Sequence, residues 1–185
     1  MDPLDIIRSY CDDDSKAYYF LIHHSRLVMR KALEVAQRVR HLKPDLKFIE
    51  EAAMLHDIGI VFTNAPQIGC FGYRHYLCHG YLGRELLERE GFPRHALVCE
   101  RHVGVGISAA EVRSNRLPLP ERDMMPLTLE EKIVSFADKF FSKSEYDLMH
   151  EKPLETVRQI VASYGEGKLE VFDSWTEIFL EGRHH

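Results

Sequence analysis

The segment from Glu51 to Ile60 constrains this chain most, because it sets an imidazole and a carboxylate at the end of an apolar helix. His56 and Asp57 follow a run of apolar residues and come just before Gly59, a residue that commonly ends helices. A helix that buries its apolar residues draws this pair toward the interior. An ionised carboxylate is costly to bury unless it is paired or binds a cation. The pattern therefore predicts a cation site at a helix end, with further ligands from elsewhere in the chain.

Helical periodicity and capping signals extend along the chain, and no alternating strand pattern is convincing. Residues 60–75 read as a long loop that could cover a site or contact a substrate. The Ser108–Glu111 and Thr128–Glu131 segments read as capping boxes that open helices. The helices are expected at 3–10, Ser15–Leu42 with a break near His23–His24, Asp45–Asp57, Tyr76–Glu90, Pro93–His102, a short segment after Ser108, Thr128–Phe141, 153–164 and 168–181. We predict an all-α helical bundle with a metal centre between helices.

Length and composition narrow the class of protein. The 185 residues fit one domain over 1–185, with a core at about 20–145 and C-terminal helices at about 153–181 packing on it. A net charge of −5 argues against binding to a nucleic-acid duplex. The 4 cysteines form no CxxC pair and read as reduced thiols of a cytoplasmic protein. We expect no signal peptide and no membrane span, which needs about 20 apolar residues. The terminal His184–His185 pair is left out of the site.

Further metal-competent side chains lie on apolar helix faces or at helix ends. Each one alone is more often a hydrogen-bonded core residue than a ligand. Together with His56 and Asp57, they suit a divalent transition metal such as iron, manganese or zinc, with magnesium as a further option. His23 is an alternative to His24 as the first histidine ligand, but His24 shares the apolar stripe of Val28 and Val35. The further candidates are His24, His79, His102 and Asp138.

Five segments in order resemble the HD superfamily of metal-dependent phosphohydrolases, named after its His-Asp pair. The likeness covers roughly residues 20–145. The stretch from Cys99 to Asp138 is most similar to a small, stand-alone and uncharacterised subfamily of the HDIG type. The five segments are His24-Ser25-x-x-Val28, Leu55-His56-Asp57-Ile58-Gly59, His79-Gly80-Tyr81-Leu82-Gly83 with Leu87, Glu100-Arg101-His102-Val103-Gly104-Val105-Gly106-Ile107, and Lys132-Ile133-Val134 with Asp138-Lys139.

The resemblance implies a ligand set and a reaction. His24, His56, Asp57 and Asp138 would surround one ion, and Asp57 would bridge to a second ion held by His79 and His102. His56, Asp57, His79 and His102 would be the catalytic residues. The reaction implied is in-line attack of a metal-bound hydroxide on phosphorus, because a bound cation lowers the pKa of water toward about 7. No protein nucleophile is needed, and the sequence contains no GxSxG motif.

Differences between this sequence and other branches of the HD superfamily narrow the range of expected substrates. His102 is followed by Val103, which counts against the branch that cleaves cyclic dinucleotides. Ile60 to Phe62 replace the Glu-Asp pair of the branch that cleaves guanosine tetraphosphate. We expect a small phosphorylated substrate, a nucleotide above all, and a dinucleoside tetraphosphate remains open. The alternatives are a one-metal 5′-nucleotidase, in which His79 and His102 contact phosphate, and a non-catalytic sensor domain that binds a nucleotide.

Three cationic residues are candidates for contacts with the substrate phosphate: Lys139, Arg101 and Arg26. Lys139 follows the predicted ligand Asp138, whereas either arginine on a helix flank is more often solvent-facing. The last helix is amphipathic around Trp175, so it either covers the core or forms a homodimer contact; a membrane helix is not expected.

Overall fold

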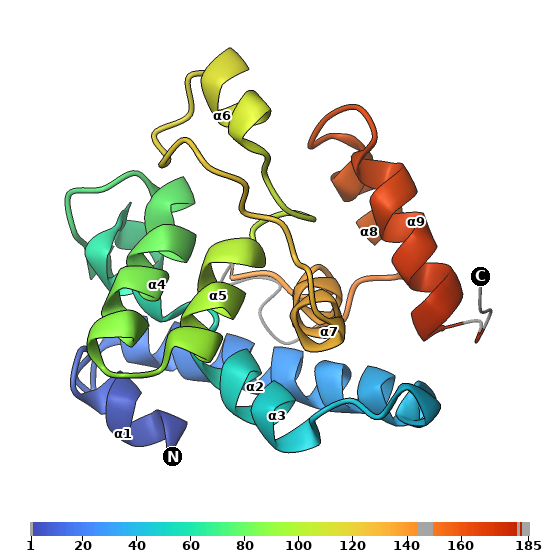
Figure 1. Cartoon of the computed structure of the whole chain (residues 1–185). Coiled ribbons are helices and arrows are strands. Elements are labelled where there is room, and N and C mark those ends of the chain that lie inside the picture. The colour runs from blue at the N-terminus through green and yellow to red at the C-terminus, as the bar shows by residue number, and fades with distance from the viewer. Residues whose placement is uncertain (1, 144–149, 181, 183–185) are drawn as a thin grey trace.

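The computed structural model of this chain describes residues 2–143, 150–180 and 182, and α-helices dominate them (Figure 1). Residues 144–145 of the expected core, residue 181 of the expected last helix and His184–His185 lie outside this part. The α-helices are α1 (Pro3–Arg8), α2 (Lys16–Arg38), α3 (Leu46–Leu55), α4 (His79–Arg89), α5 (Pro93–Arg101), α6 (Ala109–Ser114), α7 (Leu129–Asp138), α8 (Leu154–Ala162) and α9 (Lys168–Phe179). The predicted all-α class is confirmed.

The stretch expected to be a loop contains short regular elements. Strands β1 (Asn64–Ala65) and β2 (Cys70–Phe71) pair antiparallel, with Asn64 opposite Phe71 and Ala65 opposite Cys70. Four 3₁₀ turns also occur among the described residues: η1 (Arg40–Leu42), η2 (Ile58–Phe62), η3 (Pro66–Ile68) and η4 (Tyr76–Cys78). Residues 58–78 therefore hold a defined shape beside the His-Asp pair. In the part of the chain that the structure describes, no helix combines the length and apolarity needed to cross a bilayer.

Two expectations, one about helix continuity and one about helix capping, are corrected. Helix α2 runs without a break past His23–His24, because neither residue removes a backbone donor or clashes with the preceding turn. Thr128 caps α7 as expected by accepting a hydrogen bond from the Glu131 amide. The Glu131 carboxylate, however, accepts from the Leu127 amide at 2.8 Å and from Arg101, so the reciprocal half of that capping box does not form. At Ser108 the capping box with Glu111 is complete.

The buried apolar side chains form two clusters, and α2 contributes to both. Its first half, including Phe20 and Leu21, packs in a cluster with α1, η2, α4 and α5. Its second half, including Val35 and Ala36, packs in a cluster with α3, α7, α8 and α9. Figure 1 shows α2 running beneath α4 and α5 at one end and α7 at the other. His24 lies between the two halves, so the side chains that meet there lie between the clusters.

Helix α9 packs on α7 through aromatic rings. Phe136 stacks on Phe172 with ring centroids 5.0 Å apart and meets Phe179 edge-to-face at 5.3 Å. Trp175 is also buried, at 5% exposure. The apolar face of the last helix therefore covers the core, as one of the two alternatives predicted, while a homodimer stays a prediction.

A buried carboxylate ties the segment after α6 to the core. Glu100 of α5 accepts a hydrogen bond from Arg122 Nε at 2.8 Å and another from Arg84 Nη1 of α4. Its side chain is 1% exposed, whereas both arginines reach solvent. Such a carboxylate is stable only while its cationic partners remain.

We expect Glu100→Ala to lower the free energy of unfolding by about 2 kcal/mol, because two arginines lose their buried partner. Urea denaturation monitored by circular dichroism would measure the change. Glu88→Ala is the matched control, since Glu88 pairs with the same Arg84 but is half-exposed. It should cost less than about 0.5 kcal/mol. Equal losses in the two variants would contradict this role of Glu100.

Candidate metal centre

Six buried side chains from separate elements converge between the two core clusters. His24 projects from the middle of α2, and Asp138 is the last residue of α7. The other four lie at helix ends: His56 caps α3, Asp57 precedes η2, His79 begins α4 and His102 caps α5. None is more than 7% exposed. The structure thus brings together all six residues that the sequence singled out as ligands.

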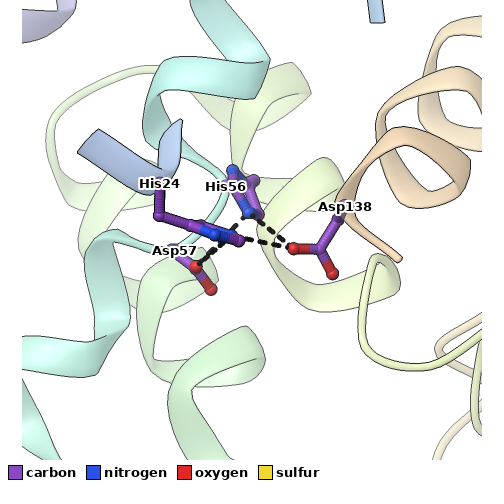
Figure 2. A group of neighbouring side chains, drawn as sticks. All are labelled: His24, His56, Asp57 and Asp138. Atoms are coloured by element: carbon purple, nitrogen blue, oxygen red, sulfur yellow. Dashed lines mark hydrogen bonds and ion pairs between the residues drawn. The ribbon is translucent and has the colours of Figure 1, made fainter. Parts of the chain in front are cut away.

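The first group contains His24, His56, Asp57 and Asp138, whose side chains point toward one another in Figure 2. His24 Nε2 lies 2.9 Å from Asp138 Oδ1 and 3.3 Å from Asp57 Oδ2. His56 Nε2 lies 3.4 Å and 3.3 Å from the same two oxygens. Two imidazoles and two carboxylates therefore present one atom each around a common point.

The second group contains Asp57, His79 and His102. Asp57 Oδ1 lies 3.3 Å from the Nε2 atom of each of these histidines, and the two Nε2 atoms are 3.1 Å apart. Asp57 Oδ2 faces the first group, so this single carboxylate turns one oxygen to each pair of histidines. That arrangement is what a carboxylate bridging two cations requires.

The helix ends set which nitrogen of each histidine faces the centre. His56, His79 and His102 each place Nδ1 2.7 Å from a backbone carbonyl three residues earlier. A carbonyl oxygen only accepts, so each Nδ1 carries the proton and donates it. In a neutral imidazole the lone pair then lies on Nε2, directed toward Asp57. Backbone contacts of this kind commonly orient histidines that bind metals.

These residues fit a divalent cation. Neutral His79 and His102 direct two lone pairs and Asp57 directs an anionic oxygen at the same point, so three acceptors face one another without an aligned donor. Ligand atoms about 2.1 Å from one ion lie about 3.0 to 3.4 Å from each other, depending on the coordination geometry. The contacts within both groups, from 2.9 to 3.4 Å, match that spacing.

Burial sets most of the protonation states that ligands need. It lowers the pKa of His24 to about 4, with help from Lys143, and that of His79 to about 3. It also lowers the pKa of His102. Histidines bind metals as neutral imidazoles, so these three are ready to act as ligands without losing a proton.

Neighbouring charges set the protonation states of His56 and the carboxylates. Burial opposes protonation of His56, but Asp57 and Asp138 outweigh it and raise its pKa to about 9. Burial would raise the pKa of Asp57, but Lys143 and His56 hold it well below the usual range. A divalent cation would supply the positive charge that the His56 proton now provides.

Two lysines lie against the carboxylates. Lys139 Nζ is 2.7 Å from Asp138 Oδ2 and donates to the His102 carbonyl at 3.2 Å. Lys143 Nζ is 2.7 Å from Asp57 Oδ2, and the Asp57 and Asp138 carboxylates raise its pKa despite burial. Sequence reasoning named Lys139 but missed Lys143. Lys143 follows the end of α7, where no helical period predicts the direction of its side chain.

Both arginines named as substrate contacts lie elsewhere, which corrects that expectation. Arg101 donates to both carboxylate oxygens of Glu131 at 3.0 Å and does not line the cavity that opens onto the centre. Arg26 lines a separate cavity beside α1. His23, the rival for the first position, packs its ring against Tyr19 with centroids 4.3 Å apart.

A cavity of about 290 Å³ opens onto the centre. His79, His102 and Asp138 form part of its wall, together with Lys139 and Lys143. Tyr76, Lys152 and Tyr164 also line it, and the sequence alone did not predict their place there. Three of the six candidate ligands therefore border a cavity, and three lysines line the same cavity.

Comparisons with known proteins found relatives that match about three quarters of this chain. The chain is 33% identical over 138 residues to an uncharacterised protein of Methanocaldococcus jannaschii, covering 73% of this chain and 70% of that protein. It is 30% and 32% identical to proteins named tRNA (cytidine(56)-2′-O)-methyltransferase from Thermoplasma volcanium and Picrophilus torridus, over 75% of this chain but only 35% of theirs. No solved structure matched the chain.

The family model described as HD domain matches residues 21–142, a range that contains all six converging residues. This range also agrees with the predicted extent of the likeness, about 20–145. The chain belongs to the HD domain family.

Proposed function

We propose that this protein is a phosphohydrolase that requires divalent metal ions and acts on a small phosphorylated molecule, a nucleotide above all. One observation carries the proposal: Asp57 divides its two oxygens between two pairs of histidines. A carboxylate so placed suits two neighbouring cations. When bound, a divalent pair polarises a phosphate ester and makes water acidic enough to attack phosphorus at neutral pH.

The lysines would bind the substrate phosphate. Lys139 and Lys143 place ammonium groups beside the carboxylates, on the wall of the cavity that opens onto His79 and His102. Cations so placed attract a phosphate dianion and neutralise the charge that develops on its oxygens. The chain itself then needs to supply no nucleophile, only the position of the phosphate relative to the ligand groups.

The open side of the centre favours catalysis over a structural role. Structural metal sites are normally closed by protein ligands, whereas His79, His102 and Asp138 border a cavity. A one-metal nucleotidase would use only the first group, with His79 and His102 contacting phosphate. The three acceptors that face one another in the second group favour a cation there instead.

Metal content would separate these functions. We expect about two iron, manganese or zinc ions per chain in protein purified without chelator, and about one in His102→Ala, which removes a ligand of the second group only. Elemental analysis measures this, with the exposed His41→Ala as control. One ion in the unchanged protein, with no loss in His102→Ala, would support the one-metal nucleotidase. No ion after reconstitution would contradict the metal centre.

A panel of phosphate esters would test the reaction by release of inorganic phosphate. It should contain nucleoside monophosphates and dinucleoside polyphosphates. Because two relatives are named as tRNA methyltransferases, it should also contain oligoribonucleotides with terminal or cyclic phosphates. We expect release from at least one class, lost on treatment with chelator. Tight nucleotide binding without any release would instead support a non-catalytic sensor.

A further inference from the structure

A second cavity, of about 370 Å³, lies next to the one that opens onto the metal centre. It is bounded by the residues after α5, by the end of α6 and by the turn between α8 and α9. Its size falls in the range of small-molecule sites, about 300 to 1,000 Å³. Most of its wall is apolar, formed by Leu77, Val103, Val105, Ile107, Leu117 and Tyr164.

The two cavities adjoin each other. Val103, Gly104 and Tyr164 line both of them. The Tyr164 ring packs against Gly104, where an added Cβ would lie 3.5 Å from the ring. Gly104 has φ +61°, a conformation that glycine adopts without strain. The Tyr164 ring therefore lies at the border between the cavity of the metal centre and the apolar cavity.

The charged residues of the apolar cavity are bound to each other. Lys168 Nζ donates to the Gly106 carbonyl at 2.8 Å and pairs with Glu111 Oε1 at 2.6 Å. The other Glu111 oxygen accepts from the Ser108 amide at 2.8 Å. With these groups satisfied internally, the wall is suited to contact with an apolar ring more than to reading a hydrogen-bond pattern.

We propose that the apolar cavity binds the organic group of the substrate, and that this group is a flat, largely apolar ring system of about nucleobase size. This inference rests on the proposed function, because it places the phosphate at the lysines and the metal centre. Tyr164, which is 46% exposed, would stack on the ring, and the aliphatic side chains would cover its other face. The cavity would thereby select phosphate esters with ring-containing leaving groups over small alkyl phosphates.

Binding of two phosphonates by calorimetry tests this without turnover, because a phosphonate lacks the ester bond that would be cleaved. We expect 1-naphthylmethylphosphonate to bind at least about tenfold more tightly than ethylphosphonate, through burial of its apolar ring. Tyr164→Ala and Leu117→Ala should each remove most of this advantage. Leu117→Ala should also leave the affinity for ethylphosphonate unchanged, because Leu117 lines the apolar cavity and not the cavity of the metal centre. Tyr73→Ala is the control, since Tyr73 is 85% exposed and lines neither cavity.

The outcomes separate this inference from the proposed function. Equal affinities for the two phosphonates, or an advantage that survives both cavity variants, would overturn the ring site. Binding of neither phosphonate by metal-loaded protein would overturn both the ring site and the phosphate site. A naphthyl advantage lost in Tyr164→Ala, together with no phosphate release from any ester, would support the ring site and contradict hydrolysis.

Discussion

Replacing Asp57 by asparagine is expected to lower phosphate release at least about 1,000-fold and to empty both metal positions. The side chain keeps its shape but loses the charge that faces His24 and His56 through Oδ2 and His79 and His102 through Oδ1. Both cations would lose an anionic ligand in one step, and transition-state charge on phosphate would lose their stabilisation. Phosphate release and elemental analysis on the same preparation measure the two effects.

Asp13→Asn is the matched control, because Asp13 is exposed, belongs to neither ligand group and does not line the cavity at the centre. It should leave metal content and activity unchanged. Circular dichroism should show the same helix content for both variants. An Asp57→Asn protein that retained two ions per chain would contradict the bridging role and, with it, the assignment of the centre.

Replacing Gly59 by alanine is expected to lower the free energy of unfolding by about 3 kcal/mol or more. An added Cβ would lie 2.0 Å from the His79 carbonyl oxygen and 2.4 Å from the Gly83 amide nitrogen, both rigid backbone atoms of α4. Turn η2 and α4 would have to separate, because a close-packed interior cannot absorb such an overlap locally. The same movement would displace His79 from Asp57. Urea denaturation and metal analysis would detect the two consequences.

Gly91→Ala provides the comparison for this substitution. Gly91 has φ +83°, but an added Cβ there meets nothing within 4 Å. Gly91→Ala should lower the free energy of unfolding by only about 1 kcal/mol, because alanine is strained in the left-handed region. A loss at Gly59 no larger than the loss at Gly91 would show that η2 and α4 are free to move apart.

Much of the centre was predictable from residues that are local in the chain. Asp57 follows an apolar helix and precedes Gly59, so burial of a carboxylate was expected from this segment alone. His56 and His102 each follow the last residue of a helix, and the ends of α3 and α5 carry recognisable glycine and capping signals. These features depend on helical periodicity and on the capping residues at helix ends. Both involve residues only a few positions apart, so they can be recognised in the sequence.

Errors arose where a side chain is directed by a distant partner. Arg101 adjoins His102 in sequence, yet it pairs with Glu131 on α7 and does not line the cavity. Lys143 reaches Asp57 from beyond the end of α7, where periodicity predicts nothing. A break was expected near His23–His24, but α2 is continuous there and contributes buried residues to both core clusters.

The sequence by itself determined the all-α class, the positions of most helix ends and the six candidate ligands. Only the tertiary structure decided that Asp57 divides its oxygens between two histidine pairs, that Lys143 joins them and that an apolar cavity adjoins the centre. The physical reason is the separation in sequence of the residues that interact. Helix period and capping act over three or four residues, whereas these contacts depend on how α2, α3, α4, α5 and α7 pack against each other.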